Sequence, residues 1–397
     1  MKKLFLIGAV AALAACSAQP ETGYTVNVTA TGDLTQLPND TLVFVGGTRQ
    51  NPVKDTVVLV NGKCAIKGET NTPTFYTLTF KGEKKAFARL FLENTKMGVT
   101  FDAAAPAEAT VTGGEIQTMV AQMNAKKEEL SKANNLDSLR KAYRTATPEE
   151  REQMMAIFEK VDKEVAAIEE AYTSVNPTSP YGLYKLASEI GYMSYAELEA
   201  ALAPYDTIAA YAENVMLKEY KEVAELVKSL QPGNQAPDFV QNDTEGKPVK
   251  FSDIYSKNKL TMVDFWASWC GPCRAFNPEL VKIYKKYHKK GFEILGVSHD
   301  SSHDAWVKGI KDDKLTWPQV SDLKYWDNEV GKMYYVRYIP QNIFVDQNGI
   351  IVGRQIDKPE VDKFIVSVRK GKVRKRANWA KMERMPRSNS SSCGSQR

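Results

Sequence analysis

Two cysteines separated by Gly and Pro come directly after a buried strand, and this junction constrains the fold more than any other segment. The apolar run LTMVDFWA (260–267) predicts the strand, and a helix is expected from Pro272 to about Lys289. Cys270 and Cys273 therefore lie at the start of that helix. Free backbone N–H groups at a helix start stabilise an anion, so the first Cys is held as a thiolate, the form that attacks a disulfide. The three-residue step brings the second sulfur within bonding reach.

The segment around this junction alternates strands and helices over residues 235–370. This order predicts a mixed α/β sheet covered on both faces. Residues 24–112 hold short runs of β-branched and aromatic residues, with Asn61-Gly62 as a hairpin turn, and predict an antiparallel β-domain of sandwich type. Residues 113–230 follow a helical pattern whose Met and aromatic stripes are expected to pack in a core. The chain of 397 residues is thus expected to be multidomain.

The N-terminus has the pattern of an export signal. Lys2 and Lys3 precede the apolar run from Leu4 to Ala15, which is too short to span a membrane as a helix. The residues LAAC, ending at Cys16, resemble the lipobox of bacterial lipoproteins. That resemblance implies a signal peptide over residues 1–16, cleavage before Cys16 and lipid attachment to it. An ordinary signal peptide with an incidental Cys is the alternative.

Charge is distributed unevenly along the chain. From Arg369 to the end there are 10 Lys/Arg and 1 Glu, whereas the remaining residues carry 43 Lys/Arg and 47 Asp/Glu, a net charge of −4. A mildly acidic body does not indicate a nucleic-acid-binding protein. The basic, Ser-rich tail over residues 371–397 is expected to be disordered, and a polybasic arm for anionic lipid is the alternative.

The remaining ionisable residues predict no metal site. A structural zinc site needs four ligands, usually two cysteine pairs, and this chain has one such pair. Cys64 is expected to be a buried packing residue in a strand, and Cys393 lies in the polar tail. His299 and His303 are expected to be solvated residues at a strand end and a helix start.

The motifs around the cysteine pair carry a family resemblance. VDFWASWCGPC (263–273) resembles the thioredoxin active-site strand and motif. The runs APDF, LTWPQVSD and YIPQNIFVDQNGIIV resemble the TlpA/ResA-like branch, membrane-tethered thiol–disulfide oxidoreductases of bacteria. This resemblance covers about residues 235–368. The preceding β-rich part resembles a poorly characterised N-terminal domain of such lipoproteins in Gram-negative bacteria, with no known chemistry.

The resemblance assigns roles to individual residues. Cys270 matches the attacking thiol and Cys273 the resolving thiol, so the redox-active pair itself is the only cofactor implied. Asp264 matches the buried carboxylate of thioredoxins, whose pKa is expected to rise in a low-dielectric strand and which passes protons to and from the resolving thiol. Pro340 matches the cis-proline that lies against the disulfide.

Further residues of the motif are expected to contact the substrate or flank the site. The resemblance implies substrate contacts for the following residues: Trp269, Gly271, Pro272 and Ile339. Trp266 matches a second flanking aromatic residue. Many ResA-like proteins carry Glu three residues after the second Cys, where this chain has Phe276. That departure argues against the narrower role of reducing the haem sites of apocytochromes.

These features together predict an exported enzyme that reduces protein disulfides. The enzyme is expected to be anchored by lipid to a membrane of the cell envelope of a Gram-negative bacterium and to face the periplasm. Its expected partners are client proteins, an electron donor at the inner membrane, and the membrane through the N-terminal lipid. A peroxiredoxin-like antioxidant enzyme is one alternative, but its Cys needs Thr or Ser three positions earlier, where Ala267 stands. A non-enzymatic, lipid-anchored binding module with a relic thioredoxin domain is another, and the intact site residues argue against it.

Overall fold

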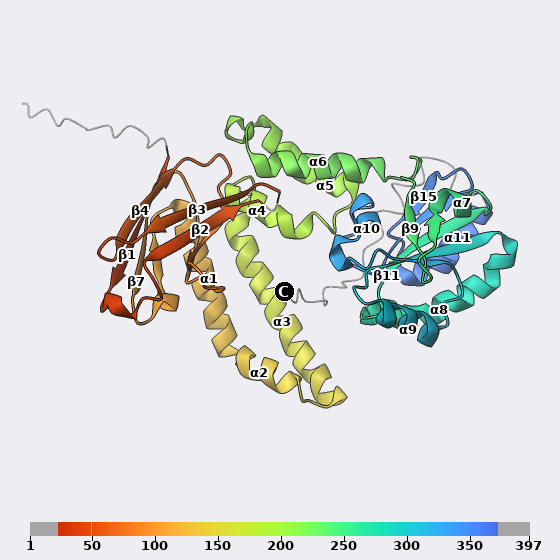
Figure 1. Ribbon diagram of the computed structural model, residues 1–397, viewed down its shortest axis with the longest axis horizontal. Coiled ribbons are helices and arrows are strands. Elements are labelled where there is room, and N and C mark those ends of the chain that lie inside the picture. The colour runs from red at the N-terminus through yellow and green to blue at the C-terminus, as the bar shows by residue number, and fades with distance from the viewer. Residues whose placement is uncertain (1–22, 49, 372–397) are drawn as a thin grey trace, which may run out of the picture. The chain divides into compact units, whose positions relative to one another are not determined.

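The computed structural model describes residues 23–48 and 50–371 (Figure 1). These residues form two compact units. One holds the described residues up to Tyr184 together with Ala210–Met216, and the other holds Lys185–Ala209 and the residues from Leu217 onward. Within the described part of the chain, no helix has the length and apolar character needed to cross a membrane. The predicted signal peptide, Cys16, the basic tail and Cys393 lie outside the described residues.

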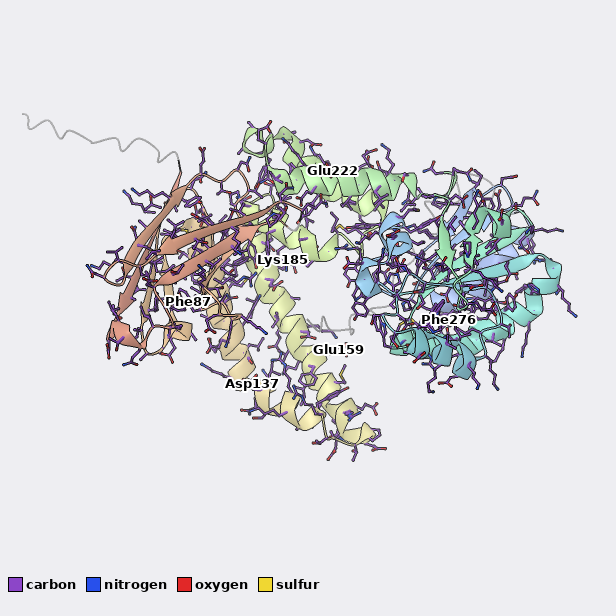
Figure 2. The ribbon with its side chains drawn as sticks, viewed as in Figure 1. Phe87, Asp137, Glu159, Lys185, Glu222 and Phe276 are labelled. Atoms are coloured by element: carbon purple, nitrogen blue, oxygen red, sulfur yellow. A yellow bond between two sulfur atoms is a disulfide. The ribbon has the colours of Figure 1, made fainter. Side chains whose placement is uncertain are left out.

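The first unit begins with a β-domain of two four-stranded sheets, ordered β4-β1-β7-β8 and β3-β2-β5-β6. Buried apolar side chains from both sheets form one core, as expected for a sandwich. Figure 2 labels Phe87, whose ring packs 4.8 Å from that of Phe101 in this core. The strands are β1 (Tyr24–Thr31), β2 (Thr41–Gly47), β3 (Pro52–Val58), β4 (Lys63–Gly68), β5 (Phe75–Phe80), β6 (Ala88–Phe91), β7 (Lys96–Asp102) and β8 (Thr110–Thr112).

The β-domain confirms the predicted class but differs from the sequence expectation in two pairings. β1 and β7 pair in parallel, not antiparallel. The Asn61-Gly62 turn is present, with φ of 51° and 75° and Val60 and Lys63 exchanging backbone hydrogen bonds of 2.8 and 3.1 Å. The expected hairpin, in which the two strands that flank this turn pair with each other, is wrong. Instead β3 pairs with β2, and β4 pairs with β1 in the other sheet. The turn therefore carries the chain from one sheet to the other.

The predicted helical stretch is divided between the two units. The sequence signals for helix starts are confirmed, since Thr147 and Ser194 each form a capping box with the Glu three residues later. The Met and aromatic stripes pack as expected, with Met123 and Val120 buried against Phe91 of β6. The helices are α1 (Glu115–Ala133), α2 (Leu136–Tyr143), α3 (Pro148–Thr173), α4 (Pro180–Glu189), α5 (Tyr195–Leu202) and α6 (Val215–Ser229).

The second unit contains the α/β domain predicted around the cysteine pair. Its five-stranded sheet has the order β13-β12-β11-β14-β15, with β11 parallel to β12 and antiparallel to β14. A separate short pair joins β9 (Val240–Asn242) and β10 (Pro248–Lys250). The strands of the sheet are β11 (Leu260–Trp266), β12 (Phe292–Ser298), β13 (Gln319–Val320), β14 (Gln341–Asp346) and β15 (Ile351–Arg354). The helices are α7 (Phe251–Tyr255), α8 (Gly271–Tyr287), α9 (His303–Asp313), α10 (Glu329–Met333) and α11 (Val361–Arg369).

All seven residues of β11 are buried, because helices cover both faces of the sheet. Side chains alternate along a strand, so the two faces divide the residues of β11 between two clusters. Leu260, Met262 and Trp266 belong to a core formed with α8 and α11. Val263 and Phe265 belong to a core on the other face, which includes residues of α7. This confirms the predicted thioredoxin-like fold and places the α8 face of β11 beneath the cysteine pair.

Candidate active site

Cys270 and Cys273 form a disulfide at the N-terminus of α8. Their Cα atoms lie 5.2 Å apart, and Cys270 is the N-cap residue of the helix. The Sγ atom of Cys270 accepts a hydrogen bond of 3.2 Å from the backbone N–H of Cys273. When the disulfide is reduced, the same N–H group and the helix N-terminus favour the anionic form of Cys270. Cys270 is 4% and Cys273 2% exposed, whereas Gly271 and Pro272 between them face solvent.

Asp264 lies on the face of β11 that points toward this disulfide. It lies on the same face of the strand as Met262 and Trp266, which both contribute to the core that includes Cys270 and Cys273. Asp264 is 4% exposed. Burial raises the pKa of its carboxyl group to about 7, and the positive charge of Lys358 opposes part of that rise. A carboxyl group with this pKa changes its protonation state at neutral pH.

Lys358 lies close to the cysteine motif in space, although it belongs to the C-terminal part of the domain's sequence. It begins a 3₁₀ turn (Lys358–Glu360) before α11, and its Nζ donates a hydrogen bond to the carbonyl oxygen of Pro272. Nζ also lies 5.5 Å from the ring centroid of Phe276. Burial lowers the pKa of Lys358, and the nearby Asp264 opposes this. Lys358 therefore links the first turn of α8, between the cysteines, with the buried carboxyl group.

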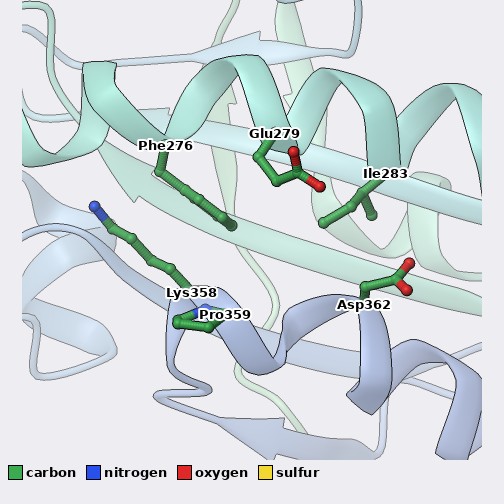
Figure 3. A pocket seen from close by; sticks show the side chains of 6 residues that line it. All are labelled: Phe276, Glu279, Ile283, Lys358, Pro359 and Asp362. Carbon is green, nitrogen blue, oxygen red and sulfur yellow. The ribbon is translucent and has the colours of Figure 1, made fainter. Parts of the chain in front are cut away.

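Phe276 lies in α8 three residues after Cys273. Figure 3 shows its ring pointing from α8 toward the segment of Lys358 and Pro359. Together with further residues of α8 and α11 they line a pocket of about 350 Å³. The lining is apolar at Phe276, Ile283 and Pro359 and charged at Glu279, Lys358 and Asp362. Phe276 therefore places an apolar ring beside the charged end of Lys358.

The loop before β14 reaches the same edge of the sheet. The peptide bond between Ile339 and Pro340 is cis, as the resemblance implied. Because Gln341 pairs with Phe265 in the antiparallel β11–β14 ladder, the preceding Pro340 lies level with the C-terminal end of β11. Ile339 packs against the core that contains both cysteines. The structure thus brings Pro340 and Ile339 to the end of the strand from which the cysteine motif starts.

The two Trp residues of the motif have different environments. Trp266 is fully buried, and its Nε1 donates a hydrogen bond of 2.9 Å to Gln319 Oε1. Trp269 is 44% exposed, and its Nε1 donates to the carbonyl oxygen of His299 over 3.3 Å. Trp269 therefore flanks the disulfide at the surface, whereas Trp266 anchors the strand below it.

His299 is not solvated, and this sequence expectation is wrong. It is 1% exposed, because it directly follows the inner strand β12 and lies under the ring of Trp326, with centroids 5.3 Å apart. Burial lowers its pKa to about 4, so the ring is neutral at physiological pH. Its Nδ1 donates to the carbonyl oxygen of Tyr325 over 3.1 Å. His303 is exposed and hydrogen-bonds through Nε2 to the carbonyl oxygen of Thr244.

Two carboxylates hold the segment around the cysteines in place. Asp300 accepts hydrogen bonds from the backbone N–H and the hydroxyl of Ser268, at 2.9 and 2.5 Å. Asp313 of α9 accepts from Arg274 and from Asn277 Nδ2, both in α8. Lys358, Asp300 and Asp313 were not predicted from the sequence, because no local motif links them to the cysteines. A charged residue close after a buried strand, as Asp300 is two residues after the end of β12, was a signal that could have pointed to one of them.

The described residues contain no group of three or more His, Cys, Asp or Glu side chains arranged to hold a metal ion. Cys64 is only partly buried in β4, where it packs against the β-domain core, so the expectation that it is buried is only partly met. Burial raises the pKa of its thiol, which disfavours the reactive thiolate. The chemistry of the described cysteines therefore centres on Cys270 and Cys273.

A cysteine pair at a strand–helix junction, a buried acid beneath it and a cis-proline beside it define a thiol–disulfide oxidoreductase with a thioredoxin fold. Comparisons with known proteins give the family. A model of the AhpC/TSA family matches residues 232–354, and a model of a domain of unknown function, DUF4369, matches residues 24–119. The thiol-disulfide oxidoreductase ResA of Bacillus thuringiensis subsp. konkukian is 31% identical over 125 residues, covering 32% of this chain and 69% of the relative. ResA of Bacillus subtilis is 32% identical over 125 residues, covering 32% of this chain and 67% of the relative.

Solved structures are also similar to part of this chain. A thiol-disulfide oxidoreductase from Bacteroides fragilis is 33% identical and covers 34% of this chain and 99% of its own, with a TM-score of 0.33. The thioredoxin domain of a thiol-disulfide oxidoreductase from Bacteroides vulgatus is 34% identical and covers 35% of this chain and 99% of its own, with a TM-score of 0.33. The chain belongs to the family of ResA-type thiol-disulfide oxidoreductases, preceded by a DUF4369 domain. Enzymes of this family act on the thiols and disulfides of protein substrates.

Proposed function

We propose that this protein reduces disulfides in exported client proteins through the Cys270–Cys273 dithiol. The observation that carries the proposal is the position of the pair at the start of α8 above a buried carboxyl group with a pKa of about 7. The helix N-terminus favours a thiolate at Cys270, and the carboxyl group can exchange a proton at neutral pH. Cys-Gly-Pro-Cys pairs are usually reducing, as in thioredoxin.

The exchange proceeds in two balanced steps. The thiolate of Cys270 attacks one sulfur of the client disulfide, so that a mixed disulfide forms and the other client sulfur leaves as a thiolate, which takes up a proton. Cys273 then loses its proton and attacks Cys270, which closes the Cys270–Cys273 disulfide and releases the second client thiol. Two electrons pass from the dithiol to the client, and a reduced dithiol or thiol donor restores the pair.

Asp264 acts in the second step as the proton acceptor for Cys273. A thiol buried behind Cys270 carries little thiolate at neutral pH, because burial raises its pKa. Asp264 shares a face of β11 with the core around Cys273, and its pKa of about 7 suits it to accept this proton and release it again. The client segment lies on a surface around the disulfide that is formed by Pro340, Ile339, Gly271, Pro272 and Trp269.

The cellular setting of the proposal rests on the N-terminal sequence. Lys2, Lys3, the run from Leu4 to Ala15 and Cys16 fit a lipoprotein signal, which supports lipid anchoring in the cell envelope of a Gram-negative bacterium with the enzyme facing the periplasm. Reducing power there has to come from a donor at the inner membrane. Cys16→Ala should release the protein from the membrane fraction and remove incorporation of radiolabelled palmitate, and unchanged membrane retention would count against the lipid anchor.

The activity is tested with insulin as a protein disulfide substrate and dithiothreitol as reductant. We expect the full-length chain to accelerate insulin reduction and Cys270→Ser to abolish the acceleration, because the attacking sulfur is gone. Cys273→Ser should accumulate mixed disulfides with client proteins, because the resolving sulfur is absent. Cys64→Ser is the matched control and should react like the wild type. Wild-type rates from Cys270→Ser would overturn the proposal.

A further inference from the structure

Three aromatic side chains form a continuous exposed surface beside the disulfide. Trp269, Tyr325 and Trp326 are 44%, 42% and 38% exposed. The ring centroids of Trp269 and Tyr325 lie 5.0 Å apart. The ring centroid of Trp326 lies 5.9 Å from both of them. Contiguous exposed apolar surface is uncommon on proteins and marks interaction sites. We call these three residues the aromatic platform, and Trp269 links it directly to Cys270.

The chain holds the aromatic platform in a defined shape. Tyr325 has a left-handed backbone with φ of +55°, and its carbonyl oxygen accepts the hydrogen bond from the buried His299. The indole N–H of Trp269 donates to the carbonyl oxygen of the same His299. Asp322 braces the segment by accepting from the backbone N–H groups of Lys324 and Glu329 at 3.1 and 2.9 Å. A non-glycine residue in this backbone region is costly and occurs where the surroundings impose it, often at functional sites.

The charges at the rim of the platform are paired with one another. Lys324 Nζ lies 2.5 Å from Glu329 Oε1, and Lys332 Nζ lies 2.9 Å from Asp327 Oδ1. These cations and anions largely cancel, so the exposed ring faces are the feature that a partner meets. Trp and Tyr in such positions dominate binding at protein interfaces, and rings held in place lose little conformational entropy when a partner binds.

We propose that the aromatic platform binds a large apolar or aromatic side chain of the client, close to the client cysteine that forms the mixed disulfide with Cys270. The occupant follows from continuity with the disulfide site, because any protein segment that presents a sulfur to Cys270 passes beside Trp269. Large apolar side chains near cysteines are buried in folded proteins and exposed in unfolded ones. The platform therefore selects cysteines of incompletely folded chains. This inference rests on the proposed function, since it needs a protein client at Cys270.

The test measures mixed-disulfide equilibria in the full-length Cys273→Ser protein, with glutathione as the competing thiol. Two peptides differ only in carrying Trp or Ser two residues from their single Cys. We expect the Trp peptide to form the mixed disulfide about 3- to 10-fold more favourably, as one stacked ring pair would give, and Tyr325→Ala with Trp326→Ala to reduce this preference to about 1 to 2. Background reaction of other thiols is subtracted with the Cys270→Ser, Cys273→Ser double variant.

Two further variants separate recognition from folding. Tyr325→Phe with Trp326→Phe retains ring faces and should retain most of the preference. Val240→Ala removes an exposed apolar side chain from the same unit, and the preference should not change. Equal mixed-disulfide formation by both peptides in the Cys273→Ser protein overturns this inference alone, and so does a preference that survives the double Ala variant. Failure of Cys270 to react with either peptide overturns the proposed function, and this inference with it.

Discussion

Asp264 places an ionisable group in a strand that the sheet and its helices bury completely. We predict that Asp264→Asn slows insulin reduction about 10-fold or more near neutral pH, because the amide cannot accept the proton of Cys273. Turnover from pH 6 to 8 measures the effect, and the rate of the first attack by Cys270, followed by stopped flow, should change less. Wild-type turnover across this range would mean that the proton of Cys273 leaves by another route.

A carboxylate at residue 276 offers a matched rescue of the Asp264→Asn variant. Phe276 lies beside the same Lys358 whose charge acts on Asp264. We predict that Phe276→Glu, introduced into the Asp264→Asn protein, restores part of the lost rate of insulin reduction. A Glu side chain near Lys358 can accept a proton in place of the missing acid. Phe276→Gln has a similar shape without the ionisable group and should leave the rate low. Equal rates for the Glu and Gln variants would contradict this explanation.

The same carboxyl group makes stability depend on pH. The pKa of the Asp264 carboxyl group rises from its ordinary value of 3.8 to about 7 in the folded protein. Between these two pH values the folded chain therefore binds more protons than the unfolded chain. Stability therefore falls as pH rises from about 4 to 7 and then levels off. We predict that Asp264→Asn stabilises the oxidised protein at pH 8, by at most about 4 kcal/mol, and has little effect at pH 4. Denaturant unfolding at both pH values measures this, and an equal effect at both would contradict it.

Lys358 sets where Asp264 titrates, because a positive charge favours the carboxylate. We predict that Lys358→Met moves the pH at which turnover rises to higher values, with a several-fold slower rate at pH 7 that recovers at pH 9. Lys358→Arg keeps the charge and should stay close to the wild type. Lys363→Met is the matched control, because Lys363 pairs with Glu360 at the surface of the same segment. An unshifted pH profile for Lys358→Met would show that the charge of Lys358 does not control the protonation of Asp264 during turnover.

At the scale of elements, the start of α8 has to be rigid for the helix N–H groups to face the sulfur of Cys270. The ion pair of Arg274 with Asp313 ties α8 to α9, and Arg274 also donates to the carbonyl oxygen of Ser268, just before the cysteines. Asp313 is mostly buried, so its loss would leave the guanidinium and the amide of Asn277 without their acceptor. The precision of the site thus depends on a helix–helix contact as well as on the motif.

We predict that Asp313→Ala destabilises the protein by about 2 kcal/mol, as expected for breaking a mostly buried, hydrogen-bonded ion pair. Denaturant unfolding measures the change, and the reduction potential of the Cys270–Cys273 pair should shift with it, since the helix start loses its anchor. Asp312→Ala removes a neighbouring, exposed carboxylate and should change stability little. Similar effects from the two variants would show that Asp313 has no special place in the fold.

At the scale of the whole molecule, the described chain closes with α11, whose Val361, Phe364 and Ile365 are buried in the core next to the cysteines. Arg369 Nη1 donates to the carbonyl oxygen of Lys290, which holds the end of this helix. We predict that deleting residues 372–397 leaves both the melting temperature and the insulin reduction rate unchanged, because α11 already packs against the core around the cysteines. A melting temperature lowered by more than about 4 °C, the scale of 1 kcal/mol in a domain of this size, would contradict this.

Much of the fold and the centre of the site followed from short-range patterns. The Cys-Gly-Pro-Cys junction, the capping boxes at Thr147 and Ser194, and the Asn61-Gly62 turn were all predictable, because each depends on the conformations of a few adjacent residues. The alternation of strands and helices predicted the mixed α/β sheet for the same reason. The resemblance of motifs then pointed to Asp264 and Pro340, which lie in recognisable surroundings.

Only the tertiary structure decided what depends on residues far apart in the chain. The sequence could not show the parallel pairing of β1 with β7, the burial of His299, or the approach of Lys358 to Asp264 and the carbonyl oxygen of Pro272. Nor could it show that Tyr325 and Trp326 extend the exposed surface of Trp269. The physical reason is that local patterns specify backbone conformation and which side of an element is apolar. The environment of a charge or ring, and hence its pKa or its availability to a partner, arises only when distant segments pack around it.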